Sequence, residues 1–338
     1  LAEVMNFPGV ILGDGGVLAK LDAFQGSPVD GHAPGVRGAA LNAYIAGGPG
    51  SDHESTSAEE AAEKLRRGMF VFLREASNAR NLDALLPALT TANLRRVALC
   101  TDDRHPPDLL DKGGIDAMLR RIIASGVPPV EATRMATLNA AEYFGLSDRG
   151  AVAPGRVADL LIVDDLDALT IREVWCGGTP VARDGEPLPW ELPEPPAPPS
   201  PRPVPPVSEE RFRIEAQPRE ARAIEVVPDQ IVTRERRVTP TVRGSDVVAD
   251  PGRDLLKIAV VERHQDSGRT AVGLVLGMGL ERGAMAGTVA HDHHNVIAVG
   301  ADDRSLVTVI RAVGGAGGGL AVADGECVVA ALPLPVGG

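Results

Sequence analysis

Short apolar runs alternate with amphipathic helical patterns over about the first 145 residues of the chain. This alternation is typical of strand-helix units that build a parallel sheet. The pattern predicts strands at residues 1–6, 27–31, just before Ser51, 69–74 and 96–101. It predicts helices at residues 57–68, 81–89, 114–125 and 129–144.

The helix predicted at residues 57–68 has the clearest ends. Ser57 and Glu60 have the spacing of a capping box, and Gly68 stands where a glycine commonly ends a helix. Five strands in this length correspond to about 28 residues per unit, close to that of an eight-stranded β/α barrel of about 250 residues. The predicted fold class is therefore α/β. Residues 1–149 are expected to form the C-terminal part of a barrel, strands 4–8, with about three units preceding Leu1.

The pattern changes after residue 149. Residues 150–186 contain short apolar runs between Gly, Pro and Asp turns, which predicts a small β unit. Proline dominates residues 187–207, so we expect a linker there rather than a ligand for a proline-binding module. Residues 208–338 are expected to form a C-terminal α/β domain, with strands near 256–261 and 325–332.

Composition narrows the classes of partner. The formal net charge of −12 argues against nucleic acid and favours a small neutral or cationic substrate. The sequence contains no run of about 18 apolar residues, so no membrane span is predicted. The 3 cysteines are isolated in the sequence, which is typical of a reducing cytoplasm. We also expect the chain to form a homo-oligomer.

Four residues with metal-binding side chains, Glu3, His32, His53 and Asp102, lie at the ends of predicted strands. Strand ends at one face of a β/α barrel point into a common mouth, where the catalytic groups lie. Each residue alone has an ordinary structural alternative, such as a hydrogen-bonded histidine or a helix cap. Together, their imidazole and carboxylate groups favour a site for Zn²⁺, Fe²⁺ or Mn²⁺ that makes hydroxide available for hydrolysis.

Three neighbouring charged residues have open assignments. Glu54 is either a general acid/base or the cap of the helix after Ser57. Arg74 and Glu75 either contact a substrate or pair with each other, and the pair is the preferred interpretation.

The motifs around these residues resemble the adenine deaminases of the amidohydrolase superfamily. The resemblance extends over nearly the whole chain. Its segments are residues 2–10 (AEVMNFPGV), 29–35 (VDGHAPG), 51–54 (SDHE), 74–75 (RE), 101–105 (TDDRH), 135–142 (MATLNAAE), 152–155 (VAPG), 158–160 (ADL) and 290–297 (AHDHHNVI).

The resemblance implies a cytoplasmic purine-salvage enzyme that hydrolyses adenine to hypoxanthine and ammonia with two divalent ions, Mn²⁺ or Fe²⁺, with Zn²⁺ as the alternative. It implies that Glu3 bridges the ions and that His32 and His53 hold one of them. Asp102 would hold the other and shuttle a proton, with Asp103 as the alternative for that role. Glu54 is the second catalytic candidate. Weaker candidates for substrate contact are Arg74, Glu75, Asp103, His291 and Asp292.

One element of the family pattern is missing. The family carries a His-x-His pair on its first barrel strand, and here only the late His291 and His293 have that spacing. Three interpretations of the run from His291 to Asn295 are open: a loop at the active-site mouth, a separate metal site or a structural polar network. Two alternatives to adenine deamination follow: hydrolysis of another cyclic amide or amino-heterocycle, or a non-catalytic fragment.

Overall fold

The computed structural model describes residues 1–189, 194, 204–217, 219–265, 267–290 and 293–334. The chain forms two compact units, Leu1–Leu192 with Pro228–Ile231, and Pro193–Val227 with Val232–Gly338. Most of the predicted linker lies outside the described residues, as do His291 and Asp292. No described helix has the length and apolar character that a membrane crossing requires.

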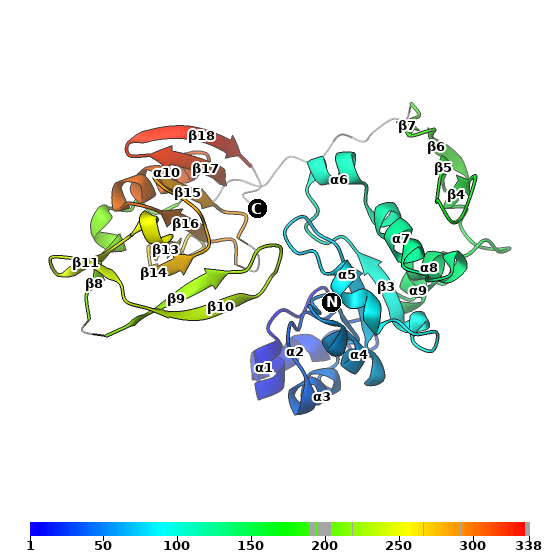
Figure 1. Ribbon diagram of the computed structural model, residues 1–338. Helices are drawn as coiled ribbons and strands as arrows, with labels where there is room; N and C mark the ends of the chain where they lie inside the picture. The colour runs from blue at the N-terminus through cyan, green and yellow to red at the C-terminus, as the bar shows by residue number, and fades with distance from the viewer. Residues whose placement is uncertain (190–193, 195–203, 218, 266, 291–292, 335–338) are drawn as a thin grey trace. The chain divides into compact units, whose positions relative to one another are not determined.

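A three-stranded parallel sheet lies in the first unit (Figure 1). Its strands, in order, are β1 (Ser51–Asp52), β2 (Phe70–Arg74) and β3 (Val97–Cys100). Two extended segments continue this arrangement beside β1. Val4 forms a parallel bridge with Gly31, and the Gly50 N–H donates to the Val29 carbonyl oxygen. The five segments predicted as strands therefore lie side by side in chain order.

The first two predicted strands are much shorter than expected. In each of them a single residue, Val4 or Gly31, forms a β-bridge. The Asn6 side chain accepts a hydrogen bond from the Gly9 N–H and caps a helix that begins at Phe7, so the first strand cannot extend further. The prediction of a strand over residues 1–6 was wrong in extent and correct in position.

Helices connect these segments. The helices of the first unit are α1 (Phe7–Leu12), α2 (Gly15–Asp22), α3 (Gly38–Ala46), α4 (Ala58–Arg66), α5 (Leu82–Leu85), α6 (Pro106–Lys112), α7 (Ile115–Ala124), α8 (Pro129–Ala136) and α9 (Leu138–Tyr143). The structure confirms the helices predicted at residues 57–68 and 114–125, which are α4 and α7. The helix predicted at residues 129–144 breaks at Thr137, whose φ of −128° and ψ of −88° are not helical.

The cap of α4 differs from a capping box in one bond. Ser57 Oγ accepts from the Glu60 N–H as predicted, at 3.3 Å. The Glu60 carboxylate instead accepts from the Thr56 N–H, at 3.1 Å, one residue before the expected partner. Gly68 follows the helix with a φ of +91°, a conformation that favours glycine.

The core of the first unit lies between the sheet and its helices. One cluster of buried side chains contains Leu65 of α4, Leu73 of β2, Met118 and Ile122 of α7 and Met135 of α8.

A separate antiparallel sheet follows, with strands β4 (Leu160–Val163), β5 (Ile171–Cys176), β6 (Thr179–Arg183) and β7 (Glu186–Pro187).

The second unit contains an eight-stranded sheet in the order β10-β9-β14-β13-β16-β15-β17-β18. Its strands are β9 (Ala221–Val226), β10 (Thr233–Val238), β13 (Leu256–Val261), β14 (Thr270–Leu276), β15 (Ala284–Gly287), β16 (Val296–Gly300), β17 (Gly319–Asp324) and β18 (Cys327–Pro333). The strands predicted near 256–261 and 325–332 are therefore confirmed as β13 and β18.

One helix and a smaller sheet complete this unit. Helix α10 (Asp303–Gly315) packs against β15, β16 and β17 (Figure 1). Its Leu306 and Ile310 are buried in the cluster that these strands form. The smaller sheet has the order β11-β12-β8, with β8 (Ile214–Glu215), β11 (Thr241–Arg243) and β12 (Asp246–Val248).

Candidate metal centre

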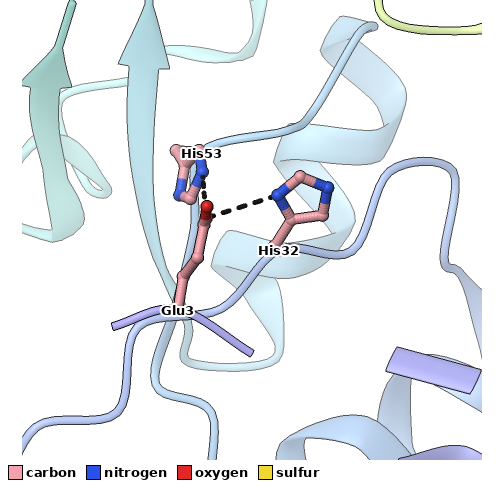
Figure 2. A group of neighbouring side chains, drawn as sticks. All are labelled: Glu3, His32 and His53. Atoms are coloured by element: carbon pink, nitrogen blue, oxygen red, sulfur yellow. Dashed lines mark hydrogen bonds and ion pairs between the residues drawn. The ribbon is translucent and has the colours of Figure 1, made fainter. Parts of the chain in front are cut away.

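Three of the predicted metal ligands, Glu3, His32 and His53, lie together (Figure 2). Glu3 Oε2 is 2.6 Å from His53 Nε2 and 3.3 Å from His32 Nδ1. The two imidazole rings meet edge to face with their centroids 5.5 Å apart. One carboxylate oxygen and two ring nitrogens therefore converge within 4.8 Å.

The backbone brings these three side chains together by close approach of their segments. A Cβ atom on Gly31 would lie 2.2 Å from the Ser51 carbonyl oxygen, so only glycine fits beside β1 at this point. The Tyr44 hydroxyl accepts from the His32 N–H at 3.0 Å and donates to the Val4 carbonyl oxygen at 3.1 Å. This one buried hydroxyl therefore joins the segments that carry His32 and Glu3.

A second group of donor atoms adjoins the first through His53. Glu54 Oε1 lies 3.4 Å from His53 Nε2 and 3.6 Å from His32 Nδ1. His53, Glu54 and Asp102 also have ligand atoms within 4.8 Å of one another. Arg74 donates through Nη1 to Glu54 Oε1 and to Asp102 Oδ2. Because Glu54 follows β1, Arg74 ends β2 and Asp102 follows β3, the carboxyl ends of three adjacent strands assemble this group.

A carboxylate that the sequence prediction missed adjoins His53 from the opposite side. Asp30 Oδ2 lies 3.7 Å from His53 Nδ1, while His53 Nε2 points to Glu3. Asp30 also accepts a hydrogen bond from Ser51 Oγ, which in turn accepts from the Tyr143 hydroxyl at 2.8 Å. A carboxylate behind a ligating histidine fixes the tautomer and the orientation of the ring. The sequence feature that could have identified Asp30 is its position in the motif at residues 29–35, two residues before His32.

A buried ion-pair network supports the segment that carries His53. Lys64 Nζ donates to Asp52 Oδ2 at 2.8 Å, to Glu60 Oε1 at 2.6 Å and to the Ala33 carbonyl oxygen at 2.8 Å. The side chains of Lys64 and Asp52 are 0% exposed. Burial opposes the charge of Asp52, but Lys64 lowers its pKa below the usual value. Helix α4 is thereby tied to Asp52, which precedes His53, and to Ala33, which follows His32.

The charges of the cluster follow from these contacts. Burial opposes ionisation of Glu3, yet hydrogen bonds to His32 and His53 lower its pKa well below the usual range. Burial would lower the pKa of His53, but the neighbouring carboxylates of Asp30 and Glu3 raise it to about 10. The pKa of His32 is also raised, because its hydrogen bond to Glu3 and the charge of Glu54 outweigh burial. Burial raises the pKa of Glu54 to about 7, although neighbouring cations lower it.

These donor groups fit a divalent transition-metal ion. Imidazole nitrogen and carboxylate oxygen are the donors that Mn²⁺, Fe²⁺ and Zn²⁺ take from proteins. Here they come from three chain segments and converge within 4.8 Å around one carboxylate oxygen. The surrounding carboxylates raise the pKa of both imidazoles, so a metal ion would compete with protons for the same ring nitrogens.

The structure corrects the preferred assignment of Arg74 and Glu75. The two side chains do not pair with each other, because successive residues of a strand point to opposite faces. Arg74 faces Glu54 and Asp102, whereas Glu75 pairs with Arg121 at 2.5 Å and accepts from the Leu82 N–H.

Glu54, Asp103 and the late histidine run are the remaining candidates. Glu54 does not cap α4, since Ser57 does so and the Glu54 carboxylate contacts Arg74 and the histidines. Asp103 lies beside Asp102, and its Oδ1 has no hydrogen-bond partner among the described residues. In the described part of the late histidine run, His293 Nδ1 accepts from the Asn295 N–H at 3.0 Å. His291 and Asp292 themselves lie outside the described residues.

Comparison with known proteins agrees with these observations. Residues 2–181 match the sequence model of the amidohydrolase family, and residues 230–338 match that of the adenine deaminase C-terminal domain. A curated protein named adenine deaminase, from Desulfatibacillum aliphaticivorans, is 49% identical over 340 residues, covering 100% of this chain and 60% of its own length. A second protein of that name, from Oleidesulfovibrio alaskensis, is 44% identical over 342 residues, covering 100% of this chain and 59% of its own length.

Likeness to solved structures is more limited. The crystal structure of beta-aspartyl dipeptidase from Fervidobacterium islandicum AW-1, in complex with a beta-Asp-Leu dipeptide, is 20% identical. It aligns over 55% of this chain and 56% of its own, with a TM-score of 0.41.

The sequence matches confirm the resemblance to adenine deaminases, and the chain spans about 60% of the length of these relatives. The amidohydrolase model covers more than half of the 338 residues, and the chain belongs to the amidohydrolase family.

Proposed function

We propose that this chain carries out, or contributes to, the metal-dependent hydrolytic deamination of adenine to hypoxanthine and ammonia. The observation that carries the proposal is the convergence of Glu3, His32 and His53 within 4.8 Å. Relatives that match the whole chain are named adenine deaminase, and a segment of the second unit matches that enzyme's C-terminal domain.

The proposal assigns the donor groups to two divalent ions. Glu3 would bridge them, His32 and His53 would hold one, and Asp102 would hold the other. Mn²⁺ or Fe²⁺ is the proposed metal, with Zn²⁺ as the alternative. A bound ion of this kind supplies hydroxide near neutral pH by lowering the pKa of its water.

The chain's own carboxylates would move the protons. Glu54 is 1% exposed, and its pKa of about 7 lets it both accept and give a proton near neutral pH. Asp102 has a side chain 18% exposed and shares Arg74 with Glu54. We propose that these two groups deliver the proton that lets ammonia leave, with Asp103 as the alternative to Asp102.

The same proposal extends to the architecture. Residues 1–149 would be strands 4–8 of the amidohydrolase barrel, and residues 150–186 its small β unit. Residues 187–207 would be a linker, and residues 208–338 the adenine-deaminase C-terminal domain. The expected assembly is a homo-oligomer in the cytoplasm.

Ammonia release from a panel of heterocycles tests the proposal. The chain is loaded with Mn²⁺, Fe²⁺ or Zn²⁺ and assayed with adenine, cytosine, guanine and a dihydropyrimidine. We expect release from adenine alone and its loss after chelation. Turnover of another compound without adenine would contradict the substrate and keep the hydrolytic class. Absence of turnover with all four would favour a non-catalytic chain.

A further inference from the structure

The guanidinium of Arg74 uses one of its three nitrogens for hydrogen bonds to the described residues. Arg74 is 2% exposed, and its Nη1 donates both to Glu54 Oε1 and to Asp102 Oδ2. Its Nε and Nη2 are buried and have no hydrogen-bond partner among the described residues. Arginine carries five N–H groups in a planar fork, so most of its donors remain available.

Glu54 has the complementary property. Its Oε1 contacts Arg74, His32 and His53, whereas its Oε2 is buried and lacks a hydrogen-bond partner within the described part of the chain. Buried polar groups in folded proteins nearly always have partners, so unpaired donors and an unpaired acceptor on two touching side chains indicate a ligand. Both side chains lie at strand ends beside the candidate metal ligands.

We propose that Arg74 and Glu54 recognise one edge of the purine: the free Arg74 nitrogens donate to a ring nitrogen, and Glu54 Oε2 accepts from the adjoining N–H. This inference rests on the proposed function. Adenine offers a ring acceptor next to an N–H donor at three places, which are N1 or N7 beside the amino group and N3 beside N9–H. Arg74 is thereby a specificity-determining residue rather than only a charge between two carboxylates.

A purely structural arginine predicts a different behaviour. Lysine at position 74 keeps a positive charge for Glu54 and Asp102 but loses the planar fork. If Arg74 only holds the carboxylates, Arg74→Lys preserves substrate discrimination and changes kcat more than KM. If Arg74 recognises the purine, the same substitution raises KM and weakens binding of adenine.

The test compares adenine with 1-deaza-, 3-deaza- and 7-deazaadenine, each of which replaces one ring nitrogen by C–H. Binding of each compound to the metal-loaded chain is measured by isothermal titration calorimetry, and turnover of adenine gives KM and kcat. The variants are Arg74→Lys and Arg74→Met, with circular dichroism to check the fold. Arg96→Lys is the matched control, because Arg96 donates to the Gly68 carbonyl oxygen at the opposite end of the sheet.

We expect wild type to bind one of the three analogues about ten- to a hundredfold more weakly than adenine, as loss of a hydrogen bond to a charged group predicts. Arg74→Lys should reduce that ratio to near one, and Arg96→Lys should retain it. If Arg74→Met does not fold, the comparison of wild type with the folded Arg74→Lys variant decides whether Arg74 recognises the purine. Unchanged discrimination in Arg74→Lys would overturn the inference while leaving the proposed function in place. Failure of wild type to bind or deaminate adenine would overturn both.

Discussion

At the scale of single residues, Glu3 determines the electrostatics of the site. Its Oε2 is the atom on which both imidazoles converge, at 2.6 Å and 3.3 Å. Glu3 raises the pKa of His32, and Asp30 together with Glu3 raises that of His53, so both imidazoles hold a proton more tightly than a free imidazole does. A metal ion must therefore compete with those protons for the same nitrogens.

This competition predicts a pH dependence of metal binding. The pKa of His53 is raised to about 10, so its proton is bound throughout the neutral range in the metal-free chain. Each proton displaced by the ion makes the apparent affinity rise roughly tenfold per pH unit below that pKa. Mn²⁺ affinity measured by calorimetry at about pH 6, 7 and 8 should therefore increase with pH. An affinity independent of pH would exclude His53 as a ligand that must lose a proton.

Removal of an imidazole tests the site more severely. We expect His53→Ala to abolish adenine turnover without unfolding the chain, because it removes a ligand and only a small part of the core. Turnover and far-UV circular dichroism are the two measurements. His105→Ala is the control, since His105 is exposed and makes no side-chain cap to α6. Turnover of His53→Ala comparable to wild type would rule out ligation by His53.

Asp30 gives a milder variant of the same test. Asn at this position keeps the size of the side chain but removes the charge that orients His53 through Nδ1. Loss of such a supporting carboxylate lowers metal affinity about 10- to 100-fold. Calorimetric titration of Asp30→Asn with Mn²⁺ checks this magnitude, and wild-type affinity in that variant would show that Asp30 does not support the ligand.

Sequence reasoning at this scale found the residue types but not their contacts. The four candidate ligands were recognisable because each follows or lies in a predicted strand. The pairing of Arg74 with Glu54 and Asp102 depends on which face of β2 Arg74 occupies. Alternation of side chains along the strand could have excluded the pair of Arg74 with Glu75. Predicting its actual partners, which follow β1 and β3, would have required the order of the strands in the sheet.

At the scale of elements, α4 stabilises the site through Lys64. This side chain is completely buried between Asp52 and Glu60 and also holds the carbonyl group of Ala33, which adjoins His32. Replacing one member of such a network leaves the remaining charges buried without a partner. The stability of the unit and the position of both histidines therefore depend on the same helix.

The element-scale prediction is a loss of stability in Lys64→Met. Removing one partner of a buried ion pair lowers the free energy of unfolding by about 3–5 kcal/mol. Urea unfolding followed by circular dichroism measures the change. Lys112→Met is the control, because Lys112 forms an exposed pair with Asp108 on α6, and no measurable change is expected there. Equal stability of wild type and Lys64→Met would show that the network contributes nothing net.

Elements with strong local signals were predictable and short ones were not. Helix α4 has a serine cap, an apolar face and a terminal glycine, and β13 is apolar at every position except Lys257, so both were found with nearly correct ends. Helices α1, α2, α3 and α6 were missed, because they are bounded by Gly or Pro and none has the capping-box spacing that marked α4. The first two strands reduce to single bridges, whose existence depends on neighbours distant in sequence.

At the scale of the whole molecule, the chain consists of two units with separate cores. The candidate ligands all come from residues 3–102 of the first unit, and the match to the adenine deaminase C-terminal domain lies within residues 230–338. The change from strand-helix units to short strands predicted a change of architecture after residue 149. The composition of the chain could not predict the order of the eight-stranded sheet, because its pairing joins strands that are not consecutive.

The number of Mn²⁺ ions bound per chain tests the central claim most directly. The chain is stripped of metal, equilibrated with Mn²⁺ by dialysis near pH 8 and analysed for metal and protein content. The account predicts at least one tightly bound ion per chain in wild type and a loss of that ion in His53→Ala. Fewer than one bound ion per wild-type chain, or equal binding by the two proteins, would contradict it.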